Sequence, residues 1–101
     1  MIAERFGLDT RTLIDIVNVS TGRSFITDVV MKEHVLDGKY ATGFALGLLA
    51  KDVKIAADLG EAVKLDAPLS RLVRERWANA RDAIGYNADN TEAIKSWNED
   101  L

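Results

Sequence analysis

Residues 43–63 read GFALGLLAKDVKIAADLGEAV, and this stretch decides the fold. Apolar side chains share one narrow sector of a helix drawn at about 100° per residue: Phe44, Leu48, Ile55, Leu59 and Ala62. Further apolar side chains widen this sector to more than half of the circumference: Ala45, Leu49, Val53, Ala56 and Ala57. A helix that is apolar over so much of its surface is normally surrounded by other helices. We therefore predict that residues 43–63 form the long central helix of the protein.

Shorter helices are predicted on both sides of this central helix. Asp9, Ser24 and Asp89 each stand where a short polar side chain can cap a helix N-terminus. Pro68 pushes the residue before it out of helical geometry, so a new helix is expected after the LDAP stretch. Together these signals predict helices over residues 1–6, 10–20, 25–36, 69–84 and 91–97. No strand-like alternation persists, so the predicted fold class is all-α, with about six helices in a single domain over residues 1–101.

Asp52 stands out because its charge projects inside the apolar sector of the central helix. A buried carboxylate is costly unless it accepts hydrogen bonds from fixed donors. We therefore predict a structural role for Asp52, tying the central helix either to the backbone N–H groups near Ser24 or to Arg76. Arg76 is a candidate because it projects into the apolar face of its own helix.

Lys51, the other charge, lies at the boundary of the apolar sector, on the same side as Phe44, Leu48 and Ile55. A lysine at such a boundary commonly lays its stem along apolar surface and extends its charge into water. From the residues alone, a solvated lysine and a functional lysine are both open for Lys51.

Composition excludes several classes of function. The net charge is −3 and no block of basic residues occurs, which argues against nucleic acid or an anionic membrane as the main partner. The chain has no cysteine, so disulfides, thiolate metal sites and cysteine nucleophiles are absent. No signal-peptide pattern opens the sequence, and no apolar run approaches the roughly 20 residues that span a bilayer. We expect a cytoplasmic protein.

The sequence contains no self-sufficient catalytic or metal-binding pattern. His34 is the only histidine, and no second ligand type lies near it, so a surface or turn histidine is expected. The loop STGRS, residues 20–24, offers hydroxyls, amides and Arg23 to a carboxylate or phosphate, but serine and glycine are ordinary in loops. No metal site and no catalytic residue is predicted in this chain.

Residues 40–68 hold a phenylalanine, a leucine pair, a lysine-aspartate dipeptide, small residues one turn later and then a proline: Phe44, Leu48, Leu49, Lys51, Asp52, Ala56, Ala57 and Pro68. This pattern resembles the C-terminal helical domain of the β-hydroxyacid dehydrogenases, the family of 3-hydroxyisobutyrate dehydrogenase and tartronate semialdehyde reductase. Residues 7–25 and 85–97 are similar to two further stretches of that domain.

The resemblance implies a fold like the C-terminal domain of 6-phosphogluconate dehydrogenase, joined through one long helix to an N-terminal Rossmann domain. Residues 1–6 would then be the tail of that interdomain helix. Such enzymes transfer a hydride between NAD or NADP and a small hydroxy acid. By the same resemblance, Lys51 and Phe44 are cofactor-binding residues near the nicotinamide end. A lysine there can hydrogen-bond cofactor hydroxyls or help to hold a substrate carboxylate.

The chain also departs from the family pattern. The glycine-rich G-x-G-x-x-G loop is absent, and so is the segment with the catalytic lysine, which is expected upstream of this chain. We therefore expect the chain alone neither to bind NAD or NADP tightly nor to turn over substrate. The family often has glycine where Lys64 ends the central helix here.

Two alternatives remain open from the sequence. The chain could be a free-standing helical module for oligomerisation or interaction, or a domain of a relative that acts on a sugar acid or an imine. For the dehydrogenase domain, the expected partners are the missing Rossmann domain, a small hydroxy-acid substrate and a second copy in a homodimer. Apolar surface left bare by the missing domain would favour such association.

Overall fold

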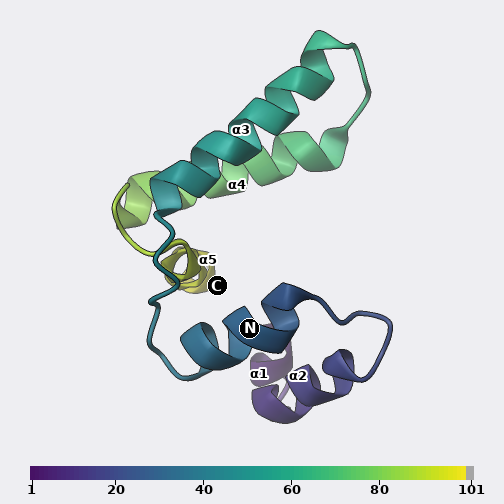
Figure 1. Ribbon diagram of the computed structural model, residues 1–101, viewed down its shortest axis with the longest axis vertical. Coiled ribbons are helices and arrows are strands. Elements are labelled where there is room, and N and C mark those ends of the chain that lie inside the picture. The colour runs from purple at the N-terminus through teal and green to yellow at the C-terminus, as the bar shows by residue number, and fades with distance from the viewer. Residues whose placement is uncertain (100–101) are drawn as a thin grey trace. The chain divides into compact units, whose positions relative to one another are not determined.

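The computed structural model describes residues 1–99, and within that range the protein is helical, with no β-strand. The chain divides into two compact units, Met1–Thr42 and Gly43–Leu101, which are described one at a time (Figure 1). The all-α class with about six helices is confirmed. None of the helices in the described range is long and apolar enough to cross a bilayer.

The first unit contains α1 (Ile2–Arg5), α2 (Thr10–Asn18) and η1 (Ile26–Leu36), the last of which is a π-helix. Helix α2 packs on η1. Asp15 of α2 and Lys32 of η1 form an ion pair of 2.5 Å between them.

The predicted caps of the first unit are confirmed. Asp9 accepts hydrogen bonds from the backbone N of Thr12 at 3.2 Å and from its Oγ1 at 2.6 Å, which starts α2. Ser24 Oγ accepts from the backbone N of Thr27 at 3.1 Å, and Thr27 Oγ1 accepts from the backbone N of Ser24 at 2.9 Å. This reciprocal pair is the geometry of a capping box. Gly7 follows α1 with φ of +88°, as expected of a residue that ends a helix.

The second unit is a hairpin of two long helices with a short helix at its base. Helix α3 (Leu46–Ala62) lies antiparallel to α4 (Pro68–Ile84), as Figure 1 shows. The 3₁₀ turn η2 (Asn90–Glu92) leads into α5 (Ala93–Glu99), which packs on α4. Pro68 is the first residue of α4, where its missing N–H costs nothing.

The start of α3 differs from the sequence prediction. The helix begins at Leu46 rather than at residue 43, because residues 43–45 are drawn out to pair with a distant segment. Gly43 has φ of +82°, and Ala45 is extended, forming an isolated antiparallel bridge to Asp89.

The core of the second unit lies where α3 begins, α4 ends and α5 begins. Leu46, Ala80 and Ala93 are fully buried there, and partly buried side chains pack against them: Trp77, Ile84 and Trp97. The two indole rings meet edge to face, with centroids 4.8 Å apart and an interplanar angle of 80°. The large side chains of the core thus gather at one end of the hairpin, while small buried residues, Ala50 and Ala57, continue along α3.

The rest of the α3–α4 hairpin keeps much of its apolar surface exposed. The exposed side chains are Ile55, Leu59, Val63, Leu65, Leu69 and Leu72. An open apolar groove of about 310 Å³ lies between the two helices, lined by Val53, Ala56, Ala57, Leu69, Ser70 and Val73. Beyond its first turn, α3 is therefore covered within this unit mainly along the side that faces α4.

The C-terminus of α3 ends in a left-handed residue that is not glycine. Lys64 has φ of +58°, its backbone N donates to Glu61 O at 3.0 Å, and Leu65 N donates to Gly60 O at 2.9 Å. These two bonds form a Schellman motif, whose left-handed position favours glycine because a Cβ is strained there.

Replacing Lys64 with glycine is expected to raise the free energy of unfolding of the second unit by about 0.5–1 kcal/mol, because strain at the left-handed position is relieved. Urea denaturation followed by tryptophan fluorescence measures this, since Trp77 and Trp97, the two tryptophans of the chain, lie in this unit. Lys51→Gly, the same change inside α3, is the control and should cost about 1 kcal/mol. A loss of stability in Lys64→Gly would contradict the prediction.

Candidate functional site

The predicted site residue Phe44 lies on the extended segment before α3, with 40% of its surface exposed. Its backbone is held by the loop that follows α4. Phe44 O accepts hydrogen bonds from the backbone N of Asn90 at 2.8 Å and from Asn90 Nδ2 at 3.1 Å. Next to it, Gly43 N donates to Asp89 Oδ2 at 3.0 Å. The position of Phe44 is thus fixed by residues more than forty positions later in the chain.

The first turn of α3 is held by the same loop. Leu46 N donates to Ala88 O at 2.7 Å, and Gly47 N donates to Tyr86 O at 2.9 Å. These donors belong to the group of N–H atoms that a helix leaves unpaired at its start, so the loop takes the place of a side-chain cap. We name the contacts between residues 43–47 and 85–90 the clasp.

The clasp brings the Tyr86 ring onto the backbone of Gly47. A Cβ at position 47 would lie 2.0 Å from Tyr86 Cδ2 and 2.3 Å from its Cγ. Only a residue without a side chain therefore fits at this position of α3.

Lys51 lies one turn beyond Gly47 on α3, and its side chain is 56% exposed. Its ion-pair partner is Asp52, with Nζ 3.5 Å from Oδ1. An exposed pair at this separation is weak, so it leaves the ammonium group accessible to another anion or hydrogen-bond acceptor. The structure thus gives Lys51 an exposed position on the same helix that begins beside Phe44.

The predicted burial of Asp52 is wrong. Its side chain is 55% exposed, and its ion pair is with the neighbouring Lys51. Arg76 is exposed as well, rather than set into the apolar face of α4. Asp52 would be buried if α3 had neighbours on most sides, but within its unit α3 packs mainly on α4. The structural role predicted for Asp52 and Arg76 stays a prediction.

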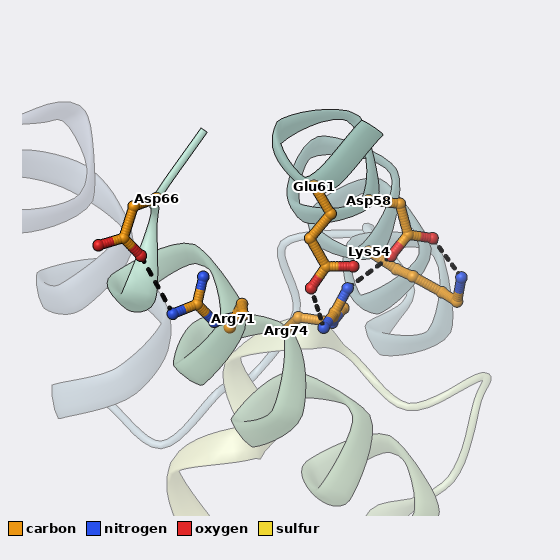
Figure 2. Close-up of polar contacts among 6 residues, drawn as sticks. All are labelled: Lys54, Asp58, Glu61, Asp66, Arg71 and Arg74. Atoms are coloured by element: carbon orange, nitrogen blue, oxygen red, sulfur yellow. Dashed lines mark hydrogen bonds and ion pairs between the residues drawn. The ribbon is translucent and has the colours of Figure 1, made fainter. Parts of the chain in front are cut away.

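A cluster of charged side chains joins the two long helices beyond Lys51 (Figure 2). Arg74 of α4 reaches across with Nη1 2.7 Å from Asp58 Oδ1 and Nη2 2.8 Å from Glu61 Oε1. Lys54 donates to the second oxygen of Asp58. The guanidinium fork thus binds two carboxylates of α3 at once, which fixes the register of the hairpin.

These contacts perturb the pKa values of the cluster. Hydrogen bonds from Lys54 and then Arg74 lower the pKa of Asp58 below its ordinary 3.8. The hydrogen bond from Arg74 lowers the pKa of Glu61 below 4.5. Hydrogen bonds to Glu61 and Asp58 raise the pKa of Arg74 further, so it is charged at any pH of interest.

The second unit is therefore expected to lose stability in acid. A carboxylate whose pKa is lowered by folding stabilises the fold above its unfolded pKa, and this contribution is lost as the pH falls through the folded pKa. The thermal midpoint, followed by tryptophan fluorescence, should fall as the pH drops below about 4.5, the ordinary value of Glu61. Arg74→Gln should flatten this fall.

Arg71→Gln is the matched control for the pH experiment. Arg71 makes a longer pair with Asp66, at 3.4 Å, and this pair does not join the two helices (Figure 2). The variant should keep most of the pH dependence of the unsubstituted chain, because Arg71 lowers the pKa of Glu61 far less than Arg74 does. An unchanged pH dependence in Arg74→Gln would show that the cluster does not carry the effect.

The loop of residues 20–24 in the first unit is engaged in its own contacts. Arg23 pairs with Asp28 at 2.9 Å, and Ser24 belongs to the capping box of η1. Within residues 1–99, no group of three or more histidine, cysteine, aspartate or glutamate side chains is placed to hold a metal ion.

The clasp is the part of the site that sequence reasoning missed. The sequence did mark Asp89 as a cap, and this is confirmed, since its Oδ1 accepts from Thr91 N at 3.1 Å. Nothing in the local pattern shows that its other oxygen reaches Gly43. A signal could have come from Gly43 and Gly47, since glycines next to an apolar run suggest a close approach of another segment.

One known protein family matches almost the whole of this chain. A family model described as the NAD-binding part of NADP-dependent 3-hydroxyisobutyrate dehydrogenase matches residues 1–97. The chain belongs to this family.

Individual relatives agree with the family match. The chain is 27% identical to 2-(hydroxymethyl)glutarate dehydrogenase of Eubacterium barkeri, over 98% of the chain and 33% of the relative. It is 28% identical to L-threonate dehydrogenase of Escherichia coli K12, over 92% of the chain and 30% of the relative. The crystal structure of 3-hydroxyisobutyrate dehydrogenase from Salmonella typhimurium superposes with a TM-score of 0.83 and 27% identity, covering 94% of this chain and 33% of that one. The chain thus spans about a third of the length of the relatives it matches.

Proposed function

We propose that the chain is the C-terminal cleft and dimerisation domain of an NAD(P)-dependent oxidoreductase that transfers a hydride between the cofactor and a small hydroxy acid of the 3-hydroxyisobutyrate type. The observation that carries this proposal is the family match over residues 1–97. The close likeness of fold to one third of a 3-hydroxyisobutyrate dehydrogenase supports it. The remaining two thirds of such an enzyme would supply the Rossmann domain and the catalytic lysine.

In the whole enzyme, α3 is proposed to be the central helix of a domain like the C-terminal domain of 6-phosphogluconate dehydrogenase. Its bare apolar side chains beyond the core support this, because a surface of this kind is normally covered. The missing Rossmann domain and a second copy in a homodimer are the proposed covers, with residues 1–6 as the tail of the interdomain helix. The enzyme is proposed to work in the cytoplasm. Asp52 and Arg76 are proposed to stabilise this assembled form.

Phe44 and Lys51 are the proposed contacts to the nicotinamide end of the cofactor. Both side chains are exposed, and the weak pair with Asp52 leaves Lys51 able to bind a cofactor oxygen. Phe44 would pack beside the apolar part of the cofactor, while the lysine donates a charge-assisted hydrogen bond. The described residues could hold only this edge of a dinucleotide, so the chain alone would bind it weakly.

Titration of the purified chain with NADH at millimolar concentration tests these contacts by ¹H–¹⁵N NMR. We expect resonance shifts at Phe44 and Lys51, and an apparent Kd raised about tenfold by Lys51→Met, which removes one charge-assisted hydrogen bond. Lys54→Met is the matched control, because Lys54 lies one turn along α3 and pairs with Asp58. Equal effects of the two variants would overturn the assignment of Lys51.

The purified chain is expected not to oxidise 3-hydroxyisobutyrate with NAD or NADP, because neither the catalytic lysine nor the glycine-rich loop is in it. Spectrophotometric detection of NADH or NADPH formation tests this. Turnover by the chain alone would overturn the proposed division of the active site between two domains.

A sugar acid is the second candidate substrate, which the likeness to an L-threonate dehydrogenase favours. A fusion of the chain to the N-terminal two thirds of the Salmonella typhimurium enzyme separates the two substrates. Faster oxidation of 3-hydroxyisobutyrate than of L-threonate by this fusion supports the first candidate, and the reverse order supports the second.

A further inference from the structure

The hydrogen bonds of the clasp bracket Phe44 on both sides. The backbone N–H before Phe44 belongs to Gly43 and donates to Asp89 Oδ2 at 3.0 Å. The carbonyl of Phe44 itself accepts two bonds from Asn90, at 2.8 Å and 3.1 Å. An extended segment without helical hydrogen bonds of its own is thus pinned at two successive residues.

The two carboxylate oxygens of Asp89 accept hydrogen bonds from different parts of the chain. One of its oxygens, Oδ1, caps η2 by accepting from Thr91 N at 3.1 Å and from Thr91 Oγ1 at 2.5 Å. The other oxygen, Oδ2, accepts from Gly43, which lies 46 residues earlier. Only a carboxylate offers acceptors on both branches at once, because an amide has a donor on one of them.

The first unit contains another aspartate cap, Asp9, with which Asp89 can be compared. Asp9 caps α2 by accepting from the backbone N of Thr12 at 3.2 Å and from its Oγ1 at 2.6 Å, through Oδ2 for both bonds. Asp9 and Asp89 therefore both cap a helix by accepting from a threonine, which lies three residues on for Asp9 and two residues on for Asp89. Asp89 in addition accepts from Gly43 through its second oxygen.

We propose that Asp89 is a positioning residue of the candidate cofactor site, acting through Gly43 to fix the backbone that carries Phe44. This inference rests on the proposed function, which places Phe44 against the nicotinamide end of the cofactor. A segment that is ordered before the cofactor arrives costs less conformational entropy on binding. Loss of the bond from Gly43 should therefore weaken cofactor binding through Phe44, without removing any group that touches the cofactor.

Asp89→Asn separates the two tasks of the carboxylate. Asparagine is as good a helix cap as aspartate, so its oxygen keeps the bonds to Thr91. Its NH₂ group then faces Gly43 N, and the bond between positions 43 and 89 is lost. Asp9→Asn is the matched control. It makes the same change at a helix cap whose hydrogen bonds go to Thr12 and not to residues 43–47.

Two measurements on the purified chain test the inference. Amide order parameters from ¹⁵N relaxation at Gly43, Phe44 and Ala45 should fall from about 0.85 to below about 0.6 in Asp89→Asn. The apparent Kd for NADH, read from the NMR shifts at Phe44 and Lys51, should rise about three- to tenfold. Asp9→Asn should change neither quantity.

Asn90→Ala is a second variant that leaves the cap and the bond to Gly43 in place. It removes one of the two donors to Phe44 O. It should therefore lower the order parameters and raise the apparent Kd for NADH, each by less than Asp89→Asn does. It keeps the inference testable if Asp89→Asn does not fold.

The possible outcomes are distinguishable. If Asp89→Asn and Asn90→Ala both keep the order parameters or the NADH affinity of the unsubstituted chain, the role of Asp89 is overturned while the proposed function stands. Failure of NADH to shift Phe44 and Lys51 in the unsubstituted chain would overturn the proposed function and the inference with it.

Discussion

Leu46→Ala is expected to lower the free energy of unfolding of the second unit by about 2–5 kcal/mol, which is the usual cost of emptying a buried leucine site. Among residues 1–99, Leu46 is the large side chain that is completely buried, at 0% exposure. It packs with Trp77, Ile84 and Trp97 at the point where three helices meet. These large side chains cannot easily collapse into the space that a leucine leaves, so the cost should include a cavity.

A loss of this size would be a large part of the total stability. Small domains are stabilised by only about 0.05–0.15 kcal/mol per residue, and the unit is short. Urea denaturation followed by tryptophan fluorescence measures the loss, because both fluorophores lie against the mutated site.

Leu59→Ala is the matched control for Leu46→Ala. It makes the same change on the same helix at a side chain that is 63% exposed, so it should cost no more than about 0.5 kcal/mol. Equal losses in the two variants would mean that the core does not lie at the base of the hairpin.

Gly47→Ala is expected to cost about 1–3 kcal/mol, because the new methyl group would overlap the Tyr86 ring. The overlap includes Cγ, the ring atom nearest the Tyr86 backbone, so rotation of the ring does not remove it. Alanine otherwise favours a helix over glycine by about 0.8–1 kcal/mol, which makes a destabilising effect a specific sign of the clasp.

A double-mutant cycle with Tyr86→Ala isolates this contact. In the Tyr86→Ala background, Gly47→Ala should be neutral or stabilising, because the ring is gone. Gly60→Ala, on the same helix with nothing within 4 Å of the added Cβ, should stabilise by about 0.5–1 kcal/mol in either background. A cost of Gly47→Ala that survives in the Tyr86→Ala background would contradict the clash.

Features set by neighbouring residues could be predicted from the sequence. The caps at Asp9, Ser24 and Asp89 and the start of α4 at Pro68 all follow from hydrogen bonds or sterics over a few positions.

Features set by distant residues could not be predicted. The sequence of α3 shows which face of the helix is apolar but not which face has a neighbour. Asp52 is for this reason predicted to be buried, whereas it is exposed. Residues 85–90 form hydrogen bonds with the first residues of the predicted helix, so the helix begins later than predicted. No local sequence pattern predicts that pairing. Lys64 adopts a left-handed conformation that its residue type does not favour, so the Schellman motif was not foreseen at this position.

The clasp also sets the order in which the protein can mature during synthesis. Phe44 and Lys51 are synthesised before residues 89 and 90, whose atoms hold the backbone beside Phe44 in place. A nascent chain that stops short of Asp89 would contain both proposed contact residues and the whole helical hairpin, yet the segment before α3 would have no acceptor for Gly43 N and no donor for Phe44 O. The segment that carries Phe44 can therefore take its place only after residues 89 and 90 have been synthesised and have folded against it.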